Sequence, residues 1–263
     1  MKKQSNVKLF QPLDVPTLVE AGALLREIGQ YYDVIKVGLG LMNRVGQPAA
    51  VNLPKVFGRQ VFADTKFYDI PNTVRDAAAG ITSLGVDYFN VMAEGMRYMM
   101  SAAMEGADKQ AREWGIKRPK VIAVTILTSQ SFDDLARRGI VPVGTKEPET
   151  KKEKQEFITS IVMKLAEEAI SAGVDCLLSS PIEAPSMIKK WPSVEVITPG
   201  IRNPDSPPDD QTRKMSPYEA AKAGITGMVI GRLIRKPPEG VTREEMAKKV
   251  RGQIDKALSE MKP

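Results

Sequence analysis

The chain has 263 residues, of which 42% are hydrophobic and 27% are charged, and its basic residues exceed its acidic residues by 38 − 32 = 6. Such a length suits one large domain with a substantial core, and α/β barrels commonly reach it as a single unit. The composition is ordinary for a soluble globular protein and argues against extended disorder.

Histidine is absent from the sequence, and cysteine occurs once, at Cys176. No intrachain disulfide can form, and a zinc site is disfavoured because zinc binds several nitrogen or sulfur ligands. The commonest general base is missing as well. We therefore expect any acid–base chemistry to use carboxylates, lysine or tyrosine.

The positive charge is spread along the chain, since the basic runs at 117–120 and 151–155 are short and lack interleaved aromatic residues. Nucleic-acid binding needs a contiguous basic face, so we expect no nucleic-acid partner. No window approaches the roughly 18 apolar residues of a membrane span, and the N-terminal residues do not resemble a signal peptide. We expect a cytoplasmic protein without a membrane partner.

Three segments are near copies of one another: SLGVDYFNV from Ser83, SAGVDCLLS from Ser171 and KAGITGMVI from Lys222. Each combines a helix end, a glycine suited to a left-handed C-terminal cap and a short apolar strand. The same alternation predicts eight strands, at 8–14, 33–38, 61–66, 86–91, 121–127, 174–179, 194–198 and 227–231. Eight such units predict an α/β fold, a (β/α)8 TIM barrel that spans 1–263 as a single domain. A doubly wound open sheet is the main alternative.

The last helix and two loops complete the predicted elements. Thr242 opens the helix with a capping box to Glu245, and its apolar face is expected to end in a buried Met261. Two stretches with loop composition interrupt the pattern, and we expect lids near 128–155 and 200–217. The first stretch is also compatible with a plain surface insertion.

Polar residues gather at the carboxyl ends of the predicted strands, where the active site of a (β/α)8 barrel lies. In chain order they are Asp14, Lys36, Asp64 with Lys66, Asn90, Thr128 with Ser129, Ser179, Thr198, and Gly231 with Arg232. This concentration of polar groups on one rim indicates a functional site.

The stretch VFADTKFYDIPNTV, 61–74, ends an apolar run with charges of both signs. Because strand side chains alternate, Asp64 and Lys66 are expected to point into the barrel, where Lys36 of the neighbouring strand can reach them. Asp69 lies beyond the strand and just before Pro71, so its side chain is expected to point toward a neighbouring subunit. From this stretch alone, a buried structural ion pair is an equally good interpretation.

A phosphate group is expected at the loops after strands seven and eight. The backbone of Gly231, the guanidinium of Arg232 and the amide of Gln211 suit a phosphate dianion, because a planar arginine can donate two parallel hydrogen bonds.

These motifs together resemble the orotidine 5'-phosphate decarboxylases, from about Leu13 to Arg235. The densest part is DTKFYDIPNT, 64–73, and the other motifs occur in the family's order: LDV at 13–15, IKVG at 35–38, LTS at 127–129, TPGIR at 198–202, DDQ at 209–211 and GR at 231–232. Tyr68 and Met92 depart from the pattern, because the family usually has histidine at both positions.

The resemblance implies decarboxylation of orotidine 5'-monophosphate in pyrimidine biosynthesis by a homodimer that uses no cofactor and no metal. It implies a charge network of Lys36, Asp64, Lys66 and Asp69, with Lys66 as proton donor and with Asp69 and Thr73 contributed across the dimer interface. The implied substrate contacts are Asp14 and Lys36 for the ribose, Thr128 or Ser129 for the pyrimidine, and Arg202, Gln211, Gly231 and Arg232 for the phosphate.

Two rival functions remain open. A sugar-phosphate decarboxylase or lyase of the same barrel superfamily would use a related Asp-x-Lys-x-x-Asp pattern to hold magnesium. A barrel that binds nucleotide or RNA without catalysis would keep the fold and lose the charge network.

Overall fold

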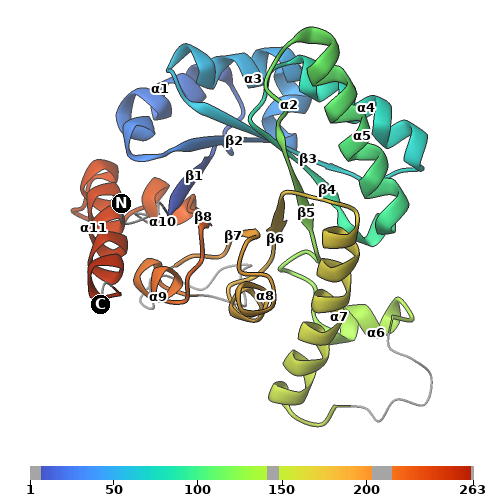
Figure 1. Cartoon of the computed structure of the whole chain (residues 1–263). Coiled ribbons are helices and arrows are strands. Elements are labelled where there is room, and N and C mark those ends of the chain that lie inside the picture. The colour runs from blue at the N-terminus through green and yellow to red at the C-terminus, as the bar shows by residue number, and fades with distance from the viewer. Residues whose placement is uncertain (1–6, 141–147, 203–214, 262–263) are drawn as a thin grey trace.

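The structure is a computed structural model, and it describes residues 7–140, 148–202 and 215–261. Within these residues eight parallel strands form one closed barrel, in which each strand pairs with the next and the last returns to the first (Figure 1). The strands are β1 (Lys8–Pro12), β2 (Val34–Gly38), β3 (Gln60–Phe67), β4 (Tyr88–Met92), β5 (Lys120–Val124), β6 (Cys176–Leu178), β7 (Glu195–Thr198) and β8 (Gly227–Val229).

Helices connect the strands and surround the barrel (Figure 1). They are α1 (Leu18–Ile28), α2 (Leu39–Val45), α3 (Gln47–Val56), α4 (Pro71–Ser83), α5 (Met96–Trp114), α6 (Phe132–Arg137), α7 (Lys151–Ser171), α8 (Ala184–Lys190), α9 (Pro217–Lys222), α10 (Arg232–Arg235) and α11 (Arg243–Glu260), with 3-10 turns η1 (Gly29–Tyr31) and η2 (Ala93–Gly95). In the part of the chain that the structure describes, no helix is long and apolar enough to cross a membrane.

The predicted (β/α)8 barrel is confirmed. The open-sheet alternative is wrong, because Leu9 of β1 pairs with Met228 of β8 and closes the ring. Several strands end earlier than expected, so that the polar residues beyond β1, β5 and β8 belong to turns rather than to strands. These turns form the carboxyl-end rim of the barrel.

The helical and loop expectations had mixed outcomes. The capping box at Thr242 is confirmed, but α11 ends at Glu260 and leaves Met261 48% exposed, so its expected burial is wrong. The expected lid near 128–155 contains α6 and the first turn of α7, and its residues 141–147 lie outside the described part of the chain. Of the second expected lid, residues 203–214 lie outside the described part of the chain, and Gln211 is among them.

The barrel interior is filled in layers by side chains from alternate strand positions. Its middle layer is apolar and contains three aromatic rings packed edge to face, with the Phe10 centroid 6.1 Å from Phe62 and 5.5 Å from Tyr88. The full buried cluster is Phe10, Val34, Phe62, Tyr88, Ile122, Cys176, Ile197 and Val229. Since this layer is solid, the two ends of the barrel are separate environments.

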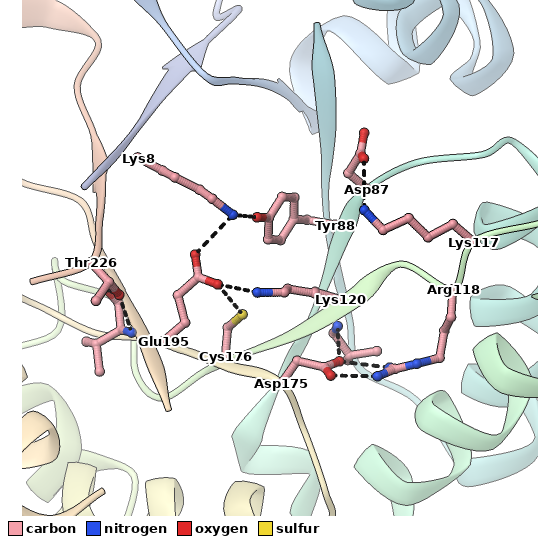
Figure 2. A network of polar contacts seen from close by, with 12 residues as sticks. Lys8, Asp87, Tyr88, Lys117, Arg118, Lys120, Asp175, Cys176, Glu195 and Thr226 are labelled. Atoms are coloured by element: carbon pink, nitrogen blue, oxygen red, sulfur yellow. Dashed lines mark hydrogen bonds and ion pairs between the residues drawn. The ribbon is translucent and has the colours of Figure 1, made fainter. Parts of the chain in front are cut away.

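The amino-terminal end of the barrel is closed by a polar network (Figure 2). The Glu195 carboxylate lies 2.5 Å from the Lys120 ammonium and 3.8 Å from that of Lys8, and Lys8 donates a hydrogen bond of 2.5 Å to the Tyr88 hydroxyl. Burial and the nearby Glu195 carboxylate raise the pKa of the Cys176 thiol well above its ordinary value. This thiol is therefore a protonated core group.

Candidate active site

Asp64 is the centre of a cluster of charged and polar side chains at the carboxyl ends of the strands. One of its carboxylate oxygens lies 2.6 Å from the Lys66 ammonium, and the other lies 2.9 Å from that of Lys36. Lys36 also lies 3.6 Å from the Asp14 carboxylate. Four side chains from β1, β2 and β3 or the turns after them thus alternate in charge along one wall.

The local shape of β3 brings Asp64 and Lys66 together. The strand leaves regular pairing with β4 between Ala63 and Phe67, and Lys66 adopts a positive φ of 48°. Few residues other than glycine adopt such a φ, and it costs of order 1–3 kcal/mol where it occurs. The two side chains meet across this irregular stretch, on the side of the strand that the alternation predicted.

The electrostatics of the cluster favour charged side chains. Burial opposes ionisation of Asp64, but Lys36 and Lys66 hold the pKa of its carboxyl well below the usual range. Burial likewise disfavours the Lys36 ammonium, yet its pairs with Asp64 and Asp14 raise its pKa above the ordinary value. The buried Lys36–Asp64 pair is therefore ionised at neutral pH, because each charge stabilises the other.

A cavity of about 260 Å³ opens above this wall. Its lining includes the cluster just described and the apolar side chains of Val124, Leu178 and Val229 from β5, β6 and β8. Pro12 of β1 and Asn90 of β4 also line the cavity, and the other lining residues come from the rim turns and the start of α10: Ile126, Leu127, Thr128, Pro199, Gly200, Arg202, Gly231 and Arg232.

The rim turns after β7 and β8 supply two guanidinium groups to the cavity. Arg202 is only 6% exposed, and Arg232 is the first residue of α10. Gly231 precedes it, and a Cβ atom at this position would lie 2.5 Å from the Pro12 ring. The turn therefore passes so close to β1 that a residue with a side chain would have to displace it.

Some side chains expected in the site lie elsewhere in the single chain. Asp69 and Thr73 are exposed at the start of α4, where the Asp69 carboxylate accepts a hydrogen bond of 2.7 Å from the backbone of Ile70. Ser129 is exposed as well, whereas its neighbour Thr128 lines the cavity. The structure thus brings together Asp14, Lys36, Asp64, Lys66, Thr128, Arg202, Gly231 and Arg232.

Asn90 was expected among the polar residues of the rim, but no role was predicted for it. Its side chain is fully buried and borders the cavity, and its amide donates a hydrogen bond of 2.7 Å to Asp64. The available signal was a single polar residue inside the apolar strand YFNVM. Buried amides are rare without a partner, so the position pointed to a specific contact.

A second cavity, of about 420 Å³, borders the same charged wall on the side of α2. It shares Asp14, Lys36, Asp64 and Lys66 with the first cavity and adds Arg44 of α2. The charge cluster is therefore approachable from two sides. Among the described residues, no group of three or more His, Cys, Asp or Glu side chains could hold a metal ion.

A closed parallel barrel with charged and arginine-lined walls at the carboxyl ends of its strands defines the class: a (β/α)8-barrel enzyme for a small anionic substrate. Comparison with known proteins gives the family. The model of the orotidine 5'-phosphate decarboxylase / HUMPS family matches residues 8–246. The chain therefore belongs to this family.

Individual relatives agree with the family match. The chain is 38% identical to an orotidine 5'-phosphate decarboxylase of Moorella thermoacetica, over 89% of this chain and 88% of the relative. It is 34% identical to that of Syntrophomonas wolfei, over 96% and 99% of the two chains. The crystal structure of the Lactobacillus acidophilus enzyme superposes with a TM-score of 0.75 at 26% identity, covering 95% of this chain and 100% of the other. By these matches the chain is an enzyme of the carboxy-lyase type.

Proposed function

We propose that this protein decarboxylates orotidine 5'-monophosphate to uridine 5'-monophosphate and CO2 in pyrimidine biosynthesis, without a cofactor and with Lys66 as the proton donor. The observation that carries the proposal is the Lys36–Asp64–Lys66 cluster, in which an ammonium is fixed 2.6 Å from a buried carboxylate at the wall of the cavity. The family membership supports the same reaction.

The geometry suits the chemistry of this decarboxylation. Loss of CO2 from the pyrimidine ring leaves an in-plane carbanion that is poorly delocalised, so a fixed cation close to the reacting carbon lowers the barrier. The Lys66 ammonium supplies that cation and then protonates the carbon. Asp64 lies next to it and holds it in place, and repulsion between Asp64 and the substrate carboxylate would raise the energy of the bound substrate.

The other cavity residues divide along the length of the nucleotide. In this proposal Asp14 and Lys36 hydrogen-bond the ribose, and Thr128 contacts the pyrimidine; all three residues line the cavity. Arg202 and Arg232, with the backbone of Gly231, form the cationic end that suits the phosphate. In this proposal Gln211, which lies outside the described residues, also contacts the phosphate, and Ser129 assists at the pyrimidine.

We propose that the active form is a homodimer in which Asp69 and Thr73 of one subunit complete the site of the other. Asp69 is exposed on its own subunit, between the exposed apolar side chains of Tyr68 and Ile70. Such a loop suits burial against a partner. In this proposal the partner's Asp69 approaches through the second cavity, which borders Lys36 and Lys66.

The two rival functions fit the site less well. Both oxygens of Asp64 already accept from lysine ammonium groups, which leaves little capacity for a magnesium ion. A non-catalytic nucleotide- or RNA-binding barrel would have no need of a buried cluster with alternating charges, because burying unneeded charges is costly. The buried position of the one cysteine suits a cytoplasmic enzyme.

The test is the change in ultraviolet absorbance of orotidine 5'-monophosphate, with purified wild type and Lys66→Ala. We expect kcat to fall by at least about a thousandfold, because both the cation and the proton donor are lost. Lys152→Ala is the matched control, since that lysine is on the surface with 86% of its side chain exposed, and it should keep wild-type activity.

Three results would contradict the proposal. Full activity of Lys66→Ala would remove the proposed proton donor. Activity that a chelator abolishes and magnesium restores would favour the metal-dependent lyase. Binding of uridylate by the wild type with no change in orotidylate absorbance would favour the non-catalytic barrel.

A further inference from the structure

The structure assigns Asn90 a role as a positioning residue, whose side-chain amide sets the mutual orientation of Asp64 and Lys66. This inference rests on the proposed function, since the orientation matters only if Lys66 reacts with the substrate. Asn90 lies in the inward-facing row of β4, directly above the apolar middle layer of the barrel, and it is fully buried.

The first observation is the irregular pairing of β3 with β4. Ala63 pairs with Phe89 and Phe67 pairs with Val91, so three residues of β3 lie opposite a single residue of β4, which is Asn90. A bulge of this kind leaves backbone groups without their regular strand partners. Those groups must find other partners, because they are buried.

The second observation is that Asn90 provides these partners. Its side-chain oxygen accepts a hydrogen bond of 2.7 Å from the backbone N–H of Lys66, and its backbone oxygen accepts one of 2.8 Å from the Thr65 hydroxyl. Its amide nitrogen donates one of 2.7 Å to Asp64. Only this orientation of the amide pairs a donor with an acceptor at both ends, so the contacts themselves fix it.

The side-chain amide of Asn90 therefore positions both Asp64 and Lys66. It holds the backbone of Lys66 at the strained φ of 48°, and it occupies the same Asp64 oxygen that the Lys66 ammonium contacts. Without it, the Asp64 carboxylate could rotate and the bulge could relax toward a regular strand. A displacement of about 1 Å in a reacting group can reduce the rate about a hundredfold.

The experiment uses two substitutions at this position and a control on the same strand. In Asn90→Ala the side-chain hydrogen bonds to the Lys66 backbone and to Asp64 are lost, together with a longer one of 3.4 Å from the Thr65 hydroxyl. We expect kcat to fall about a hundredfold while KM changes by less than about threefold, because the phosphate and ribose contacts that bind the substrate are unaltered. Tyr88→Phe removes a buried hydroxyl two residues away and is expected to lower the melting temperature by about 2–4 °C with kcat unchanged.

The isosteric Asn90→Asp gives a signature that a merely structural role would not give. A carboxylate here can accept from Lys66, but it cannot donate to Asp64 and repels it. When the introduced carboxyl is protonated, its O–H group can again donate a hydrogen bond to Asp64. The charged groups around it are those of the cluster: Asp64 and Lys66 on β3, Lys36 on β2 and Asp14 beyond β1. Burial and the adjacent Asp64 raise the pKa of the introduced carboxyl, so kcat should recover as the pH is lowered.

The outcomes separate this inference from the proposed function. The positioning role is supported by two results: a low kcat with unchanged KM in Asn90→Ala, and a kcat that rises at low pH in Asn90→Asp but not in wild type. Wild-type kcat in either Asn90 variant overturns the inference. A loss of kcat that is independent of pH and that Tyr88→Phe also shows, in proportion to the fall in melting temperature, overturns it as well. If Lys66→Ala is inactive while Asn90→Ala is not, only the present inference fails; if Lys66→Ala is active, the proposed function fails.

Discussion

Asp64 shows how a single carboxylate can remain charged although it is 8% exposed. Burial alone would favour its neutral form, but each of its oxygens contacts one ammonium group, and the two attractions outweigh the burial. The arrangement also makes Asp64 indispensable to its neighbours, because Lys36 would otherwise be a buried cation with only a distant partner in Asp14. Removal of the carboxylate is therefore more harmful than the small change in volume suggests.

We expect Asp64→Ala to lower the free energy of unfolding by about 3 kcal/mol at pH 7, because breaking a buried pair leaves an uncompensated charge. The pKa of Asp64 is lower in the folded state than in the unfolded state. The stabilisation by its carboxylate is therefore fully present above the unfolded-state pKa of about 4, and it is lost as the pH falls toward the lower folded-state pKa. Urea unfolding at pH 7 and at pH 3 measures the free energy of unfolding of both proteins. The difference in this free energy between wild type and Asp64→Ala should be smaller at pH 3. A difference that is independent of pH would contradict the assigned ionisation.

The sequence predicted the charged residues of the site better than it predicted their positioning. Asp14, Lys36, Asp64 and Lys66 could be placed on one rim because they follow predicted strands of a barrel, although a structural ion pair was an equally good interpretation of the central stretch. The role of Asn90 could not, since one polar residue in an apolar strand is compatible with many contacts, and the bulge that gives it a function depends on the pairing of β3 with β4.

At the scale of elements, α4 and α5 pack closely against each other on the outside of the barrel. Gly106 of α5 makes this approach possible, because a Cβ atom there would overlap the carbonyl oxygen of Arg75 in α4. The alternation of strands and helices predicted helices between the strands, but it could not predict how closely α4 and α5 approach, which depends on two surfaces that meet only in the folded chain.

Gly106→Ala should therefore destabilise the protein by about 1–2 kcal/mol, even though alanine favours helix formation by about 1 kcal/mol over glycine. Gly80→Ala in α4 is the matched control, because no atom lies within 4 Å of the position of its new Cβ, and it should raise stability by about 0.5–1 kcal/mol. Thermal unfolding of both variants measures the contrast. Equal stabilisation in both would mean that α4 and α5 lie further apart than described.

At the scale of the whole molecule, the sequence was most informative about the barrel itself. Three near-identical helix–glycine–strand segments and a regular alternation sufficed to predict eight units, and eight units have a strong preference for closure. The sequence predicted the assembly of subunits less directly, because the contacts of exposed apolar residues such as Tyr68 and Ile70 depend on the surface of a partner. The proposed dimer is therefore best tested by complementation.

Two inactive chains should restore activity when they are combined. In a heterodimer of Lys66→Ala with Asp69→Asn, one site has both changes and the other has neither. Equal mixing after unfolding and refolding should then give about a quarter of wild-type activity, because half of the dimers are mixed and each has one intact site. Each variant refolded alone is the control. If the mixture stays as inactive as its components, Asp69 serves its own subunit.

The alternation along β4 links the two ends of the barrel. Tyr88 joins the network at the amino-terminal end, and Asn90 holds the bulge at the other end, and both occupy the inward-facing row of the strand. A slip of one residue would turn both side chains toward the helices at once. The register of β4 is therefore favoured by two hydrogen bonds, one of a hydroxyl at one end of the barrel and one of an amide at the other. A barrel with β4 out of register would lose both and would be less stable and inactive.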